Sequence, residues 1–333
     1  MKRKLLAGIL LLVMLMSVGC GVIQNMEGKL EELTGQLTDS SVLSDAVSSV
    51  ANEVDDVEKY NHYIDISDLL SDRIDLCLTG YETRICPLND DYKVTKKKFS
   101  GWINSIGEYE INKLQTAFDN AGKTPSMEPV DSKYLALHEV AVPLVNALTE
   151  AYEYYEAKSY VDDDFAKGEE IHNKIREHVE AYYVTANEFD AVLNELAHER
   201  TLNEISRFEE EGRVMLYWAN VFILDAKELC QYLSEVELKK DVAQIDAEVY
   251  KALYDKVAAS QAEFAKVATE EQAEQEGIRM LFSSFKTAVT EFKAEAANIV
   301  QAINDGDKVD VDDINDVFDE YSDMIDDYNR MIW

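Results

Sequence analysis

The feature that most constrains the fold of this chain is the spacing of its apolar residues. From about residue 56 onward they recur three and four residues apart, and only 13 glycines and 4 prolines interrupt 333 residues. This is the period of an amphipathic α-helix. The clearest stripes lie at 57–78, 134–155, 171–208, 215–236, 242–267, 278–303 and 314–331. We therefore expect an all-α fold, an elongated antiparallel bundle of about seven to eight helices in a single domain over 56–333.

One region departs from this regularity. Residues 82–130 carry three of the four prolines and, apart from a helical piece at 108–118, show no sustained period. We expect them to form an irregular cap or lid on the bundle. Pro143 lies inside the stripe at 134–155 and should kink that helix, because proline lacks a backbone N–H and clashes with the preceding turn.

The first 20 residues have the features of a processing signal. Three basic residues at 2–4 precede an apolar run at 5–16, which is shorter than the roughly 20 residues needed to cross a bilayer. The run ends in Ser17-Val18-Gly19-Cys20, which resembles the lipobox of bacterial lipoproteins. In that family the cysteine is acylated and becomes the first residue of the mature chain. The alternative is an ordinary signal peptide with a coincidental cysteine.

The lipobox resemblance implies a domain organisation and a location. Residues 1–19 would be the signal peptide and residues 20–55 a flexible tether, since they are small, polar and rich in serine. Acyl chains on Cys20 would anchor the protein to the bacterial membrane on its extracytoplasmic side.

The charge of the chain limits its partners. The formal net charge is −34, and loss of the three basic residues at 2–4 leaves 29 Lys and Arg against 66 Asp and Glu, or −37. Such a surface repels phosphate polymers, which excludes nucleic acid as a partner. It also opposes contact of the body with anionic lipid. A protein of the cell envelope is the partner class that we expect.

The cysteines leave one question open. Cys77 and Cys86 lie nine residues apart, across an expected turn at Leu78-Thr79-Gly80. They could form a disulfide in an oxidising compartment, or remain two free thiols. Cys230 lies on a helical stripe and is expected to be a small buried hydrophobic residue.

The stretch from Tyr154 to Ile175 looks more like a binding site than any other. It runs from aromatic residues through Asp162, Asp163 and Asp164 into a helix. Aspartates at the start of a helix accept backbone N–H bonds and suit its positive end, so a capped corner between two helices explains most of the pattern. The competing hypothesis is a metal or ligand site.

The metal hypothesis rests on Glu169 and His172, which form a Glu-x-x-His pair of the kind found in di-iron bundles. A second such pair, Glu195 and His198, follows 26 residues later. If both pairs lie on one helix they are about 39 Å apart and share no metal. His138 lies on an apolar stripe and is expected to be a histidine of the core.

Two other charged stretches have simpler explanations. Residues 304–313 are rich in aspartate, but the glycine is misplaced for a calcium loop, so we expect a turn in which Asp312 or Asp313 caps the last helix. Weak calcium binding is the alternative. The basic cluster of Lys93, Lys96, Lys97 and Lys98 is expected to pair with carboxylates of the protein itself, or to meet an anionic partner.

The residues of the candidate site also resemble a known family, the YiiG-like bacterial lipoproteins, which are helical and of unknown function. The resemblance is carried by Tyr154, Tyr155, Lys158, Tyr160, Asp162, Asp163, Phe165, Lys167, Gly168 and His172, and more weakly by Lys59-Tyr60-Asn61-His62-Tyr63-Ile64. It implies a lipid-anchored, all-helical domain but no activity. The candidate binding patch that we take from it is Tyr155, Tyr160, Asp162, Asp163 and His172.

The sequence favours a non-enzymatic protein of the cell envelope that binds a partner or acts as a scaffold. We name no catalytic residue and no cofactor. The first alternative is a metal- or small-ligand-binding protein, or a metalloenzyme, that uses His172, Glu169 and nearby aspartates. The second is a structural spacer without a specific ligand.

Overall fold

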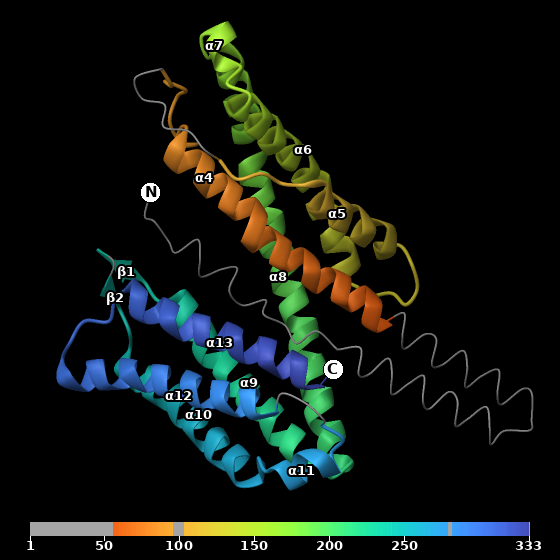
Figure 1. Ribbon diagram of the computed structural model, residues 1–333, viewed down its shortest axis with the longest axis vertical. Helices are drawn as coiled ribbons and strands as arrows, with labels where there is room; N and C mark the ends of the chain where they lie inside the picture. Colours follow the sequence, from red (N-terminus) through yellow and green to blue (C-terminus); the bar gives the residue numbers. More distant parts are fainter. Residues whose placement is uncertain (1–55, 96–102, 241, 279–281, 333) are drawn as a thin grey trace, which may run out of the picture. The chain divides into compact units, whose positions relative to one another are not determined.

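A computed structural model describes residues 56–95, 103–240, 242–278 and 282–332, and within them the protein is all-α, as expected (Figure 1). The first helix covers residues 56–84: it is α-helical at 56–69, π-helical in η2 (Leu70–Asp75) and α-helical again in α4 (Leu76–Arg84). The elements that follow are α5 (Glu108–Ala121), α6 (Val130–Glu156), α7 (Tyr160–Asp163), α8 (Ala166–Glu210), α9 (Val214–Glu235), β1 (Leu238–Lys239), β2 (Val242–Ala243), α10 (Ala247–Val267), α11 (Glu270–Gln275), α12 (Phe282–Asp305) and α13 (Val311–Ile332).

The contacts divide the described residues into two compact units. The N-terminal unit ends at Leu193 and the C-terminal unit begins at Asn194, so the boundary falls within α8. A single cooperative domain over 56–333 stays a prediction. Among the described helices, none combines the length and the apolar character needed to cross a membrane.

The N-terminal unit brings together the first helix, α5, α6 and the beginning of α8. The first helix runs antiparallel to α5, because Asp65 pairs with Lys113 whereas Lys59 reaches Ala121. It is also antiparallel to α8, since Ser67 bonds Asp190 and Tyr81 meets His172. The core between these helices is largely aromatic: Tyr63, Tyr134 and Phe189 contact one another from three different helices.

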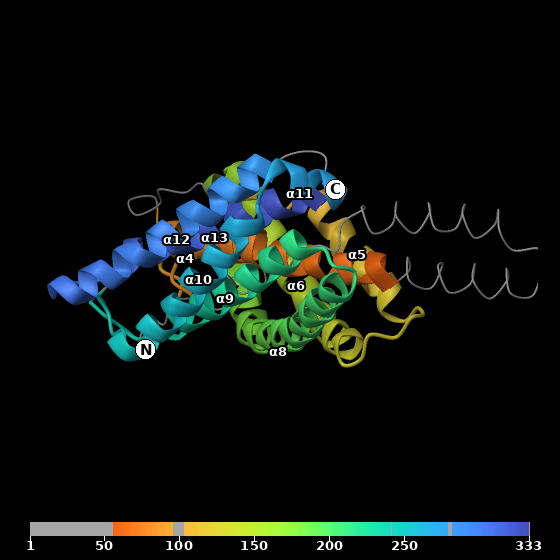
Figure 2. The ribbon, with the colours of Figure 1, turned by 90° about the horizontal axis from the view of Figure 1, so that it is seen from below.

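The C-terminal unit contains a four-helix bundle whose helices pack their apolar faces together. α9 packs against α10, α10 against α12, α12 against α13, and α13 against α9 (Figure 1, Figure 2). Its largest fully buried side chains are aromatic rings from these helices, among them Phe222, Phe264, Phe285 and Phe292. The stripes that the sequence shows at three- and four-residue spacing thus form one shared core.

Several expected boundaries are wrong in detail. Val242 lies in a two-stranded hairpin, in which Leu238 pairs with Ala243, rather than at the start of a helix. α10 begins only after Asp246, whose carboxylate accepts the backbone N–H groups of Glu248 and Val249. The described part of 82–130 is irregular outside α5, as expected, while its role as a lid stays a prediction.

The aspartate-rich stretch at 304–313 forms the turn between α12 and α13. Asp310 accepts the N–H of Asp312 at 3.0 Å and that of Asp313 at 3.3 Å. Asp313 in return accepts the N–H of Asp310 at 2.7 Å. This is a reciprocal cap, in which Asp310, rather than Asp312 or Asp313, is the N-cap residue that precedes α13.

Cys77 and Cys86 are free thiols in the structure. The expected turn at residues 78–80 is wrong, because these residues lie within α4. The two thiols have separate partners, and that of Cys86 lies 3.7 Å from the carbonyl oxygen of Asp91. Cys77 donates instead to the carbonyl of Asn104, and burial raises the pKa of its thiol to about 11. Cys230 is buried, as expected.

Candidate binding site at the corner between α6 and α8

The candidate patch lies where the chain leaves α6 and enters α8, around the short helix α7 (Figure 1). Nine residues connect the end of α6 to the start of α8. Three of them, Lys158, Asp164 and Phe165, have left-handed backbone with φ of 56°, 54° and 70°. For a bulky residue such as Phe165 this conformation is rare and costs energy. The corner therefore holds a strained turn that its surroundings must stabilise.

Asp163 is the residue that holds this turn. Its carboxylate accepts the hydroxyl of Tyr154 at 2.7 Å and the backbone N–H groups of Phe165 at 3.1 Å and Lys167 at 3.0 Å. The Tyr154 hydroxyl is the main reason why the pKa of Asp163 is lowered. The expectation that an aspartate caps the start of α8 thus fits Asp163, and the cap extends to the end of α6.

The outer face of the corner is formed by α7 and the residue that follows it. Asp162 and Asp164 are exposed, and the side chain of Val161 is 55% exposed. Tyr160 is half-buried, with its ring stacked on that of Phe165 at 4.8 Å between centroids. The corner therefore presents two carboxylates around one apolar side chain.

The two remaining residues of the patch, Tyr155 and His172, are buried and are not part of this surface. His172 is fully buried, with Nε2 at 3.0 Å from the carbonyl oxygen of Asp90 and Nδ1 at 3.2 Å from the hydroxyl of Tyr81. A carbonyl only accepts, so Nε2 carries the proton and Nδ1 accepts from Tyr81. Burial also lowers the pKa of His172, which keeps the ring neutral.

This geometry does not fit the metal hypothesis. Both ring nitrogens of His172 are engaged within the protein, whereas Glu169 is exposed. Across the described ranges, no three His, Cys, Asp or Glu side chains are grouped as metal ligands. Glu195 and His198 lie on α8 together with Glu169 and His172, as the sequence analysis expects. His138 is half-buried and stacks on Phe118 at 4.3 Å between ring centroids.

Gly168 allows two tyrosines, Tyr92 and Tyr155, to pack against α8. A Cβ atom at this position would lie 2.2 Å from the Tyr92 hydroxyl and 2.9 Å from that of Tyr155. These two hydroxyls bond each other at 2.8 Å. The glycine of the quoted motif thus has a packing role: it lets a pair of tyrosines lie directly against the helix.

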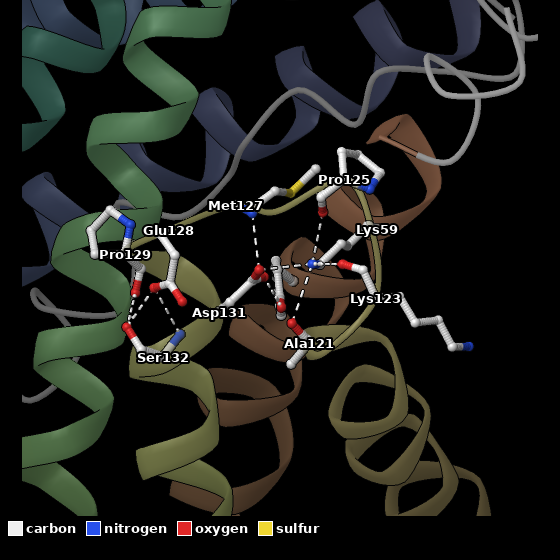
Figure 3. Close-up of polar contacts among 10 residues, drawn as sticks. Lys59, Ala121, Lys123, Pro125, Met127, Glu128, Pro129, Asp131 and Ser132 are labelled. Carbon is white, nitrogen blue, oxygen red and sulfur yellow. Dashed lines mark hydrogen bonds and ion pairs between the residues drawn. The ribbon is translucent and has the colours of Figure 1, made fainter. Parts of the chain in front are cut away.

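A second buried polar cluster, which the sequence analysis missed, surrounds Lys59 (Figure 3). Lys59 and Asp131 are 3% and 4% exposed and form an ion pair at 2.8 Å. The ammonium group also donates to main-chain carbonyls of the segment between α5 and α6, those of Ala121, Lys123 and Pro125.

Asp131 is equally well satisfied. It accepts the hydroxyl of Tyr63 at 2.6 Å. It also accepts the backbone N–H of Met127 at 2.9 Å (Figure 3). Lys59 and Tyr63 both belong to the weaker part of the quoted resemblance, at 59–64, which was the only signal for this cluster. The ordinary expectation for a lysine is an exposed position.

Two predictions of the sequence analysis concern residues that lie outside the described ranges. Cys20 and the tether at 20–55 lie outside the described residues. The same holds for Lys96, Lys97 and Lys98, so of the basic cluster only Lys93 is described.

Comparison with known proteins supports a family assignment. A family described as "Protein of unknown function (DUF3829)" matches residues 54–330. The uncharacterized protein YiiG of Escherichia coli (strain K12) is 27% identical over 247 residues, which cover 69% of this chain and 66% of that protein. The chain thus spans slightly less than two thirds of this relative. No solved structure matches. Because the family match covers most of the chain, the protein belongs to the DUF3829 family, which includes YiiG-like proteins and has no known function.

Proposed function

We propose that this protein is a lipid-anchored, extracytoplasmic lipoprotein that binds a protein of the cell envelope without catalysing a reaction. The proposal of an anchor rests on the sequence, in which a basic start, an apolar run and small residues lead to Cys20. The proposal of a protein partner rests on the outer face of the corner between α6 and α8.

The observation that carries the binding proposal is the strained backbone of this corner. Among the described non-glycine residues, four have a left-handed φ, and three of them are Lys158, Asp164 and Phe165. Strain of this kind persists where the surrounding structure enforces it, and it often accompanies function. Here the enforced turn displays the exposed side chains of Val161, Asp162 and Asp164 together, which suits a partner with basic groups beside an apolar one.

The test is cross-linked capture from native membranes with the tagged full-length chain. The variant Asp162→Asn/Asp164→Asn removes both exposed charges, and asparagine tolerates the left-handed backbone at position 164. The matched control, Asp316→Asn/Asp319→Asn, removes two exposed charges from α13. We expect the corner variant to lose at least about fivefold in partner yield, since a rim charge pair of this kind contributes on the order of 1 kcal/mol or more.

The melting temperature separates binding from folding. Asp162 and Asp164 are exposed, so both double variants should melt close to the original protein. Equal capture by the corner variant and the original chain would refute the binding face. Cys20→Ala should release the protein from the membrane fraction, and its retention there would refute the anchor. If no partner is enriched over the Cys20→Ala control, the binding function itself is refuted.

A further inference from the structure

A second pair of acidic side chains lies inside the N-terminal unit, between the first helix and α8. Asp190 on α8 is 3% exposed. Its Oδ1 atom accepts the hydroxyl of Ser67 at 3.0 Å. Its Oδ2 atom is buried and has no hydrogen-bond partner among the described residues. A buried carboxylate oxygen without a partner is costly while it carries charge.

Asp75 is the other acid, at the last position of the π-helical segment η2. The hydroxyl of Tyr182 lies 3.5 Å from its Oδ1 atom, a long and weak contact. The charge of Asp190 acts on Asp75 and opposes its ionisation. For both acids burial is the main cause that raises the pKa, to about 7 in each case.

Within the described ranges, the charged and titratable groups that act on Asp190 and Asp75 bring no positive charge. The first helix contributes Asp68, and α8 contributes Tyr182 and Tyr183. Lys133 on α6 pairs with Glu188 on α8 at 2.8 Å. The contrast with Asp131 is direct, because that buried carboxylate has Lys59 as its partner.

We propose that Asp190 is a buried proton-binding site and that, together with the half-buried Asp75 further along the same interface, it makes the packing of the first helix against α8 sensitive to pH. A proton on Asp190 removes the charge from the oxygen that has no partner. A buried carboxyl without a cation is expected to hold its proton well above its ordinary range. The π-helical turn matters because it places Asp75 in this interface, and such turns often mark functional positions. This inference is independent of the proposed function.

The direction of the effect follows from linkage. The folded protein binds these protons up to about pH 7, whereas in the unfolded chain an aspartate releases its proton near 3.8. Between those values the folded state holds more protons, so stability falls as pH rises and levels off above about pH 7. His138 and His172, whose pKa is lowered by burial, act in the opposite direction. A variant must therefore be compared with the original protein at each pH.

The experiment is urea unfolding of the protein and its Asp190→Asn variant from pH 5 to 8. Asparagine resembles the protonated acid and does not titrate. We expect the ratio of their folding constants to shift in favour of the variant by about tenfold per pH unit between 5 and 7. Infrared difference spectra of the folded protein should show a protonated carboxyl band that disappears near pH 7 and is absent, or halved, in the variant.

Two further variants keep the proposal testable if Asp190→Asn does not fold. Ser67→Ala removes a bond that stabilises the ionised form, so the infrared transition should move to higher pH. Asp163→Asn is the control, because its carboxyl has a lowered pKa and should leave the transition between pH 5 and 8 unchanged. A pH-independent ratio would overturn the proposal. So would stabilisation of the original protein alone by Na⁺ or Ca²⁺ at pH 8, since the site would then hold a cation.

Discussion

The two units are both built from packed helices, yet they bury different side chains. In the N-terminal unit the buried polar side chains are Lys59, Ser67, Asp131, His172 and Asp190. In the C-terminal unit they are Asn220, Ser260 and Glu276. The comparison shows that a unit with non-helical segments needs buried polar side chains, because the main-chain groups of those segments are not bonded within a helix. The N-terminal unit holds non-helical segments through Lys59, Asp131 and His172, which bond main-chain atoms of those segments. The core of the bundle of α9, α10, α12 and α13 consists mainly of packed apolar side chains.

The largest expected effect comes from the buried ion pair. Lys59→Met keeps most of the apolar stem but leaves Asp131 charged and unpaired, which should cost about 3–5 kcal/mol of unfolding free energy. Lys113→Ala, which breaks a half-exposed pair with Asp65, should cost only about 0–1 kcal/mol. Denaturant unfolding measures both. A loss below about 1 kcal/mol for Lys59→Met would show that Lys59 does not hold the segment between α5 and α6.

The Lys59→Met variant also tests whether the two units unfold together. Hydrogen exchange should show faster opening first in the described residues up to Leu193. Equal acceleration on both sides of that residue would instead support the single cooperative domain expected from the sequence.

The next effect is steric. Gly168→Ala should destabilise the protein by about 1–3 kcal/mol, because the new methyl group meets the Tyr92 and Tyr155 hydroxyls. Gly122→Ala is the matched control, since nothing lies within 4 Å of its added Cβ atom. Thermal melting of the two variants measures the difference. If both melt alike, the tyrosine pair is not packed against α8 as the structure has it.

A smaller effect is expected in the C-terminal unit. Glu276 accepts the N–H groups of Met215 at 2.7 Å and Leu216 at 3.0 Å, and so caps α9 from about 60 residues further along the chain. Glu276→Ala should cost about 0.5–2 kcal/mol, and the exposed neighbour Glu274→Ala should be nearly neutral. Urea unfolding followed by Trp fluorescence suits this comparison. If Glu276→Ala lost as much unfolding free energy as Lys59→Met, the two units would not differ in how strongly they depend on buried polar side chains.

The sequence predicts the helices well because apolar periodicity records burial directly. The stripes at 134–155, 215–236 and 314–331 become α6, α9 and α13 with small changes at the ends. The hairpin at 238–243 and the continuation of α4 through Gly80 were missed, because short strands and tolerated helical glycines leave little pattern. The π-helical turn leaves none.

The site was predicted less completely, for a different reason. Asp163 was a foreseeable cap, since its partners are local in sequence. His172 was not foreseeable as a buried residue, because its partners, Asp90 and Tyr81, lie more than 80 residues away. The same holds for Lys59, whose acceptors become neighbours only when α5 and α6 are in place.

The enclosure of Lys59 has a consequence for chemical labelling. Acylating reagents modify amines that solvent can reach, and the Lys59 ammonium group is enclosed by three carbonyls and a carboxylate. It can react only when the N-terminal unit opens, whereas exposed lysines such as Lys251 and Lys266 react in the folded state. The acylation rate of this one amine, read by mass spectrometry, would therefore report the opening free energy of the N-terminal unit in the full-length protein, with no engineered probe.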